Sequence, residues 1–154
     1  MLLTQKEIID IVKKGQAKGE TFVVTNGCFD ILHVGHVRYL QKTKECADKL
    51  IVMLNSDVSV KSIKGDDRPI NCEADRAEIL SSLSCVDYVV LFDEKSPAKL
   101  LEDIKPDVYT KGADYTLETL PERDILLRNN IKVEFIEFVQ GKSTTNVIKK
   151  INDK

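Results

Sequence analysis

Residues 25–36 read Thr25-Asn26-Gly27-Cys28-Phe29-Asp30-Ile31-Leu32-His33-Val34-Gly35-His36. An apolar run over 22–24 breaks at Asn26-Gly27, and two histidines follow, three positions apart; they are the only histidines in the 154 residues. If 22–25 form a buried strand and 34–43 a helix, the turn between them brings backbone N–H groups and both imidazoles to the carboxyl edge of a parallel sheet. This edge is where α/β proteins bind nucleotides.

The spacing of the two histidines predicts a phosphate site. Positions i and i+3 at a helix start lie on one face, so both rings can reach one polyanion beside the positive end of the helix dipole. Gly35 between them lets a phosphate or ribose approach the backbone. A surface or capping pair and a metal site are the alternatives, but the four cysteines show no Cys-x-x-Cys spacing that would complete a zinc site.

The composition is that of a soluble globular protein with no global charge field. Lys plus Arg (23) nearly balance Asp plus Glu (25), so neither nucleic acid nor an anionic membrane is an expected partner. No basic amino-terminal region with a long apolar stretch and no run of about 18 apolar residues occurs, which favours a cytoplasmic location. Length and the lack of repeats or linkers indicate one domain over 1–154.

Strand-like and helical segments alternate along the chain. Apolar runs at 22–25, 50–54, 88–92, 108–110 and 133–138 predict about five strands in a doubly wound, Rossmann-like parallel sheet of the α/β class. Helices are expected from a capping box at 4–7, with Leu3 and Ile8 as its staple, from an N-cap at Asn71, from Ser96-Pro97, and over 145–151. The segment 61–69 is expected to be a polar loop that folds over a triphosphate or is simply solvated.

Further segments extend the pattern of the first motif. They are Lys64-Gly65 with Arg68-Pro69-Ile70-Asn71, Cys85-Val86-Asp87-Tyr88, Lys111-Gly112-Ala113-Asp114-Tyr115 and Ser143-Thr144-Thr145-Asn146. Together with His33-Val34-Gly35-His36, which matches a His-x-Gly-His signature, they resemble the cytidylyltransferase-like nucleotidyltransferases of the HIGH type. Within that family the chain is similar to the heptose 1-phosphate adenylyltransferase branch, from about residue 3 to residue 151, standing alone rather than fused behind a sugar kinase.

The resemblance implies an activity. ATP and D-glycero-D-manno-heptose 1-phosphate would give ADP-heptose and pyrophosphate, with Mg²⁺ accompanying ATP, for lipopolysaccharide or another surface glycan. A homodimer is also implied. Two alternatives stay open: transfer to another phosphate, such as glycerol 3-phosphate with CTP or flavin mononucleotide with ATP, and a non-catalytic nucleotide-binding regulator.

The resemblance also implies site residues. His33, His36 and Lys44 would act on the triphosphate as catalytic residues, although Lys44 is also compatible with a solvated helix position. Nucleotide contacts would come from Asn26, Gly27, Cys28, Phe29, Asp30, Arg76, Lys111, Gly112, Asp114, Ser143 and Thr144.

Several of these positions have a plainer interpretation. Arg76 fits a surface ion pair, and Cys28 fits a small turn residue better than a nucleophile. Ser143 and Thr144 fit simple helix capping. Asn55 and Asp57 would face the sugar, or would only form a turn.

Overall fold

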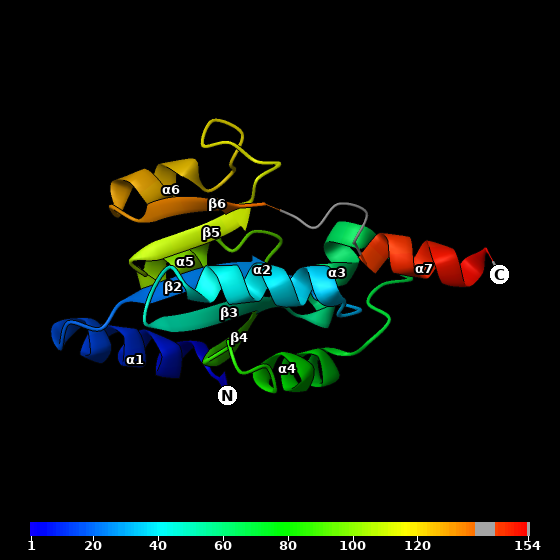
Figure 1. The fold of residues 1–154 in the computed structure, drawn as a ribbon, viewed down its shortest axis with the longest axis horizontal. Helices are drawn as coiled ribbons and strands as arrows, with labels where there is room; N and C mark the ends of the chain where they lie inside the picture. The colour runs from blue at the N-terminus through cyan, green and yellow to red at the C-terminus, as the bar shows by residue number, and fades with distance from the viewer. Residues whose placement is uncertain (138–143, 154) are drawn as a thin grey trace.

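A computed structural model describes residues 1–137 and 144–153, which form an α/β fold (Figure 1). The strands are β1 (Leu2–Leu3), β2 (Phe22–Gly27), β3 (Lys49–Asn55), β4 (Tyr88–Phe92), β5 (Val108–Gly112) and β6 (Lys132–Ile136). The helices are α1 (Gln5–Ala17), α2 (Val34–Lys44), α3 (Asp57–Lys64), α4 (Glu73–Ser81), α5 (Ala98–Ile104), α6 (Arg123–Arg128) and α7 (Thr144–Asn152). No described helix is long and apolar enough to cross a membrane.

The strands form one parallel sheet in the order β1-β4-β3-β2-β5-β6. Along the chain, β3 and β4 are added one after the other on one side of β2, and β5 and β6 are then added on its other side. The direction of winding therefore reverses between β2 and β5. This reversal opens a crevice at the carboxyl ends of these two strands. The Rossmann-like fold expected from the alternation of strands and helices is confirmed.

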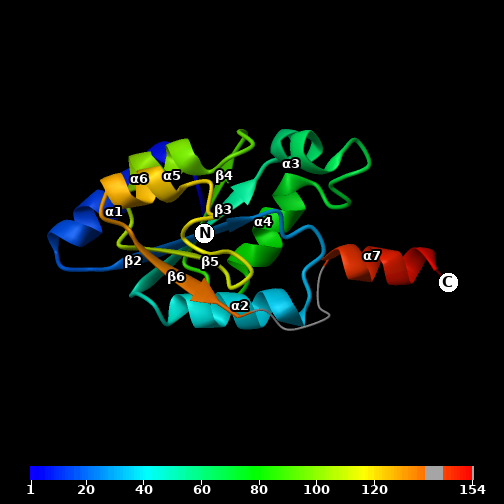
Figure 2. The ribbon, with the colours of Figure 1, turned by 90° about the horizontal axis from the view of Figure 1, so that it is seen from above.

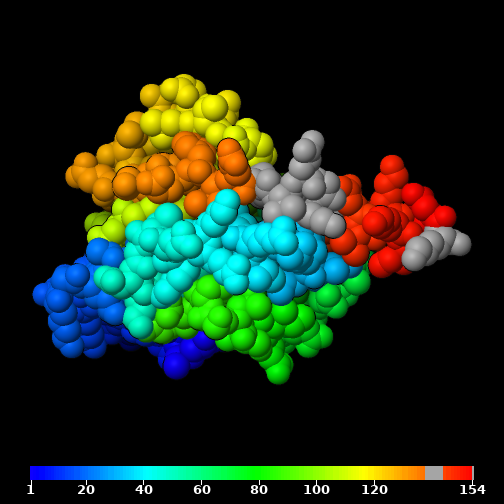
Figure 3. All heavy atoms as spheres, in the orientation of Figure 1, coloured from blue at the N-terminus to red at the C-terminus, as the bar shows by residue number. Residues whose placement is uncertain are grey.

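Helices cover both faces of the sheet (Figure 2). α1, α5 and α6 pack on one face, where Ile8, Leu101 and Leu126 are buried against strand residues. α2 and α4 pack on the other, with Leu40 and Leu80 buried. α7 extends away from the sheet, beyond the carboxyl ends of the strands, in Figures 1 and 2, and it projects from the rest of the molecule as the red atoms of Figure 3.

The predicted start of α1 is confirmed in detail. Thr4 accepts a hydrogen bond from the Glu7 N–H at 3.2 Å, and Glu7 accepts one from the Thr4 N–H at 2.7 Å. Ile8 is buried, and Leu3 packs against the same cluster, as expected for the staple.

Other element boundaries differ from the sequence prediction. The expected loop 61–69 begins inside α3, whose start is capped by Ser56: its hydroxyl accepts a hydrogen bond from the Ser59 N–H. Asn71 is not the cap of α4; its amide donates to the Asp30 carbonyl, and Cys72 takes the cap position. Pro97 lies one position earlier than expected, at the N-cap of α5. The two-residue β1 and the short α6 were not predicted, and residue 138 of the fifth expected strand lies outside the described residues.

A buried cluster of hydroxyl groups fixes α2 against the sheet. The Tyr39 hydroxyl lies 2.9 Å from Thr25 Oγ1 and 3.2 Å from Thr110 Oγ1, and Thr43 Oγ1 lies 3.3 Å from Thr110 Oγ1. Thr25 comes from β2, Thr110 from β5, and the other two residues from α2. The cluster therefore joins the helix that carries His36 to the two strands that flank the crevice.

Removing one hydroxyl from this cluster should destabilise the fold. We expect Tyr39→Phe to lower the free energy of unfolding by about 1–3 kcal/mol, because the buried threonine hydroxyls lose a partner without gaining water. Urea unfolding measures this loss. Tyr88→Phe is the matched control, since the Tyr88 hydroxyl makes no hydrogen bond within 1–137 and 144–153. Equal losses in the two variants would contradict the role of the cluster.

Candidate active site

A cavity of about 570 Å³ opens at the carboxyl ends of β2 and β5, where the winding of the sheet reverses. Its volume lies in the range of small-molecule sites. The turn after β2 forms one wall, and the ends of α3, β5 and α7 contribute others. The lining includes Asn26, Gly27, Cys28, Phe29, Asp30, His33, Gly35, His36, Tyr39, Asn55, Ile63, Lys64, Arg68, Lys95, Ser96, Pro97, Lys111, Gly112, Tyr115, Pro121, Glu122, Thr144 and Thr145.

The two imidazoles stack on each other at the first turn of α2. Their ring centroids are 3.8 Å apart, with 27° between the planes. His33 is the N-cap, and its Nδ1 accepts the Gly35 N–H at 3.1 Å. His36 Nδ1 accepts the His33 N–H at 3.3 Å. The histidines therefore form a capping box. Capping the helix and binding a phosphate, the two roles considered for this pair, use the same geometry.

These two backbone hydrogen bonds determine where the ring protons lie. A ring nitrogen that accepts an N–H carries no proton, so in each neutral imidazole the proton is on Nε2. Both rings line the cavity. The start of α2 thus supplies two Nε2–H donors in addition to its free backbone N–H groups, which suits an anion.

His36 is held in its neutral form. Burial away from water, reinforced by the neighbouring charge of His33, lowers its pKa from 6.5 to about 4. At neutral pH His36 therefore offers a neutral N–H donor. A phosphate placed against the ring would favour the protonated form and raise this pKa.

The turn before α2 is tightly packed around Gly27. A Cβ at Gly27 would stand 2.8 Å from Cε2 of Phe29, so a side chain there would displace the Phe29 ring. Phe29 adopts the left-handed φ of 46°, and its ring lies 5.1 Å from that of His36. Residues 27–29 all line the cavity, at the carboxyl edge where the sequence places this turn.

Asp30 anchors the segment 68–71 at the cavity wall. Its fully buried carboxylate accepts hydrogen bonds from Arg68 Nε at 2.9 Å and from the N–H groups of Ile70 and Asn71. Burial alone would raise the Asp30 pKa, but these hydrogen bonds bring it below its ordinary value. Asp30 also lines the cavity, so its predicted nucleotide contact stays a prediction beside this structural role.

Arg76 lies behind the cavity, away from the position that a nucleotide contact requires. Its side chain is fully buried and donates to the carbonyls of Cys28 and Asn55 at 2.8 and 2.7 Å. It also donates to the Asn71 carbonyl and to the Asp57 carboxylate. Arg76 does not line the cavity and is not a surface ion pair; it ties together the three turns that surround the site.

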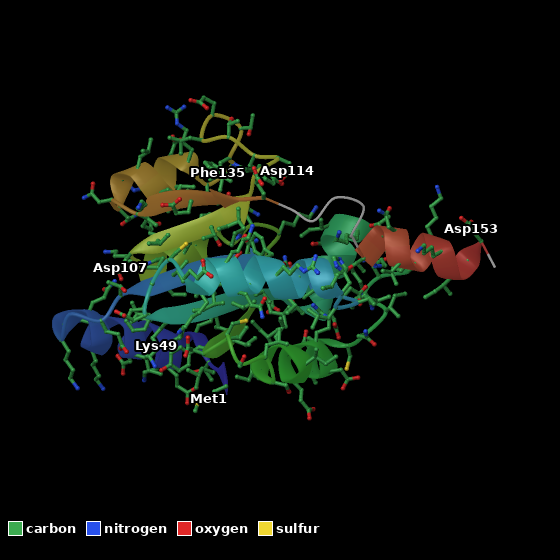
Figure 4. All side chains as sticks on the ribbon, in the orientation of Figure 1. Met1, Lys49, Asp107, Asp114, Phe135 and Asp153 are labelled. Atoms are coloured by element: carbon green, nitrogen blue, oxygen red, sulfur yellow. The ribbon has the colours of Figure 1, made fainter. Side chains whose placement is uncertain are left out.

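Lys44 lies at the opposite end of α2, about 12 Å along the helix from His36. Its ammonium donates to the Asp87 carboxylate at 2.6 Å and to the Asp48 carbonyl. Asp87 also faces Lys49, which Figure 4 labels at the start of β3, at the amino edge of the sheet. The phosphate role predicted for Lys44 is corrected, because eight helical residues carry it away from the cavity.

The remaining predicted residues are divided between the cavity and its surroundings. Lys111, Gly112, Asn55 and Thr144 line the cavity. The Thr144 hydroxyl donates to the Ile31 carbonyl, which joins the start of α7 to the turn before α2. Asp114 follows β5, at the opposite end of that strand from Asp107 (Figure 4), and does not line the cavity. Asp57 does not line it either, and its carboxylate forms an ion pair with Arg76. Ser143 lies outside the described residues.

Several lining residues were not predicted individually. Lys64 and Arg68 belong to the segment 61–69, which was expected to fold over a triphosphate, and both line the cavity. Lys95, Pro121 and Glu122 also line it, and no sequence pattern pointed to them. Basic side chains gather here with the histidines, so the cavity suits a polyanion. Burial raises the pKa of the Cys28 thiol, which favours the unreactive protonated form over a nucleophile.

These features define a nucleotide-binding α/β protein, and comparison with known proteins agrees. The cytidylyltransferase-like family model matches residues 24–150. The bifunctional protein HldE of Syntrophotalea carbinolica is 47% identical over 150 residues, covering 97% of this chain and 31% of that protein. The bifunctional protein HldE of Geobacter metallireducens is 52% identical over 141 residues, covering 92% and 29%. The chain spans about three tenths of the length of these relatives.

Two solved structures share the fold. The lipopolysaccharide core biosynthesis protein of Thermoplasma volcanium is 31% identical, with a TM-score of 0.64 over 80% of this chain and 100% of that chain. Pantothenate synthetase of Thermus thermophilus is 17% identical, with a TM-score of 0.66 over 95% and 66%, which is a likeness of fold alone. The chain belongs to the cytidylyltransferase-like family of nucleotidyltransferases.

The lowered pKa of His36 predicts a pH dependence of stability. Unfolded His36 takes up a proton near pH 6.5 and folded His36 only near pH 4, so the unfolded state binds more protons between these values. Stability should therefore fall as the pH drops through this window, by up to about 3 kcal/mol. Urea unfolding of wild type and His36→Asn isolates the effect, since other groups cancel in the difference. A difference that does not change with pH would contradict the prediction.

Proposed function

We propose that the chain transfers AMP from ATP to D-glycero-D-manno-heptose 1-phosphate, releasing pyrophosphate and forming ADP-heptose. Nucleotidyl transfer follows from membership of the family. Support for the heptose acceptor comes from the resemblance of the motifs and from the 47–52% identity to bifunctional HldE proteins. The relative from Thermoplasma volcanium, a lipopolysaccharide core biosynthesis protein, points to the same area of metabolism.

The observation that carries the proposal is the pair of Nε2–H donors at the start of α2. In the reaction, a phosphate oxygen of the sugar 1-phosphate bonds to the α-phosphorus, and the bond from this phosphorus to the bridging oxygen breaks. Pyrophosphate leaves with the electron pair. Donors that are already in place stabilise the charge that develops, without any reorganisation of solvent.

No residue of the chain needs to act as a base in this reaction. The second pKa of a phosphate monoester is about 6, so the attacking oxygen is mostly ionised at neutral pH. The work of the enzyme is to align two anions and to offset their charge. Lys64, Lys95 and Arg68 at the cavity wall, with the N–H groups at the start of α7, are suited to this role.

Mg²⁺ is proposed to enter with the phosphates of ATP. Among residues 1–137 and 144–153, no group of three His, Cys, Asp or Glu side chains could hold a metal ion. The described residues therefore do not form a metal cage, and we assign no step of the protein to the ion. Mg²⁺ commonly binds through substrate phosphates and water. The homodimer implied by the resemblance stays a prediction.

Pyrophosphate release tests the function. We expect turnover with MgATP and one anomer of heptose 1-phosphate, and not with CTP, GTP or UTP, nor with glycerol 3-phosphate or flavin mononucleotide as acceptor. Preference for another pair would overturn the acceptor or the nucleotide. Nucleotide binding without release for any pair would favour a regulator.

His36→Ala should lower kcat about 100- to 1,000-fold, because an electrostatic donor is lost. Arg38→Ala is the control on the same helix, since Arg38 is absent from the cavity lining. Unchanged pyrophosphate release by a folded His36→Ala protein would contradict the role of this residue.

A further inference from the structure

Glu122 is a buried carboxylate at the cavity wall that the reaction above does not use. The residue is 4% exposed and lines the cavity, yet its Oε2 has no hydrogen-bond partner among residues 1–137 and 144–153. It directly precedes α6, but its side chain makes no capping hydrogen bond there. A helix cap and an internal ion pair, the two structural roles expected of a glutamate at this position, are thus both absent from the described structure.

A second charged group lines the cavity, close enough to Glu122 for the two charges to interact. Lys111, at the end of β5, is largely buried and lines the cavity with Glu122. Its ammonium stands 5.2 Å from the centre of the Tyr115 ring, and no carboxylate of the described residues lies within 4 Å of it. This wall therefore offers a hydrogen-bond acceptor and a hydrogen-bond donor, beside an aromatic ring.

The cost of this arrangement indicates a ligand. A buried polar atom left without a partner costs about 1–3 kcal/mol, and more when it is charged. An ionised carboxylate only accepts hydrogen bonds, so its partner must be a donor. A carboxylate also repels phosphate groups, which are better placed among the histidines and Lys64, Lys95 and Arg68. The uncharged parts of a nucleotide that carry donors are the ribose hydroxyls and the base, and the Tyr115 ring beside Lys111 favours the base.

We propose that Glu122 selects nucleobases that carry an amino group at position 6 of a purine or position 4 of a pyrimidine. Glu122 accepts a hydrogen bond from the amino group, and Lys111 donates to the adjacent ring nitrogen. Adenine and cytosine both present this pair, an amino group next to an unprotonated ring nitrogen. Hypoxanthine and uracil present a carbonyl oxygen next to a ring N–H, so their oxygen would face the carboxylate. The inference rests on the proposed nucleotidyl transfer and adds the residue that discriminates between bases.

The test compares ATP with ITP, which differ only at position 6 of the base and in the proton on N1. We expect wild type to favour ATP in kcat/KM by about 100-fold or more, because a buried acceptor left unpaired strongly rejects the wrong base. Glu122→Gln is close in shape, and its amide can donate to the carbonyl of hypoxanthine. It should lower the preference for ATP at least about tenfold, mainly through KM, with kcat little changed.

Glu118→Gln is the matched control. Glu118 belongs to the same segment but is exposed and absent from the cavity lining, so the same loss of charge should leave the ATP preference unchanged. Dissociation constants of ATP and ITP, measured without acceptor, should follow the same pattern. The effect then belongs to the nucleotide and not to the sugar.

The outcomes separate this inference from the proposed function. An ATP preference unchanged in Glu122→Gln, or a change confined to the KM of the sugar phosphate, would overturn the role of Glu122 while turnover with ATP upholds the function. Absence of turnover by wild type with every nucleotide would overturn the function. The dissociation constants would still decide whether Glu122 discriminates between bases.

Discussion

The hydrogen bonds from two backbone N–H groups to Nδ1 of His33 and of His36 are the interactions on which the site depends. They close the first turn of α2, and at the same time they leave each ring proton on Nε2. Capping and ligand recognition are therefore one arrangement, not competing uses of the histidines. Burial then lowers the pKa of His36 and keeps it a neutral donor.

Two buried charged residues hold the surroundings of this turn in place. Asp30 gathers the backbone of 70–71 and the Arg68 side chain, and Arg76 joins the turns after β2 and β3. Neither charge is isolated, since each is surrounded by hydrogen-bonding partners, which is the condition under which a protein tolerates a buried ion. Their contribution is to position the turns, while Lys64, Arg68 and Lys95 present positive charge at the cavity wall.

The sequence predicted most of the fold, because apolar runs and caps are local signals. It predicted the turn at 25–36 and the paired histidines for the same reason. It failed where a role depends on distant partners: Arg76 suggests a nucleotide contact or a surface ion pair until Cys28 and Asn55 are brought beside it. Lys44 was misplaced although its helical spacing from His36 already pointed to the far end of α2. Glu122 could not be singled out, because its burial depends on the unpredicted α6 and on the cavity.

Nitrogen-15 NMR of the imidazole rings tests the central claim most directly, since the chain contains only two histidines. At pH 7 we expect His36 to be neutral with its proton on Nε2, and the neutral form of His33 to be the same tautomer. We also expect both Nε2 signals to shift when a non-hydrolysable ATP analogue with Mg²⁺ is added. A neutral ring that carries its proton on Nδ1, or Nε2 signals that do not respond to the analogue, would contradict this account.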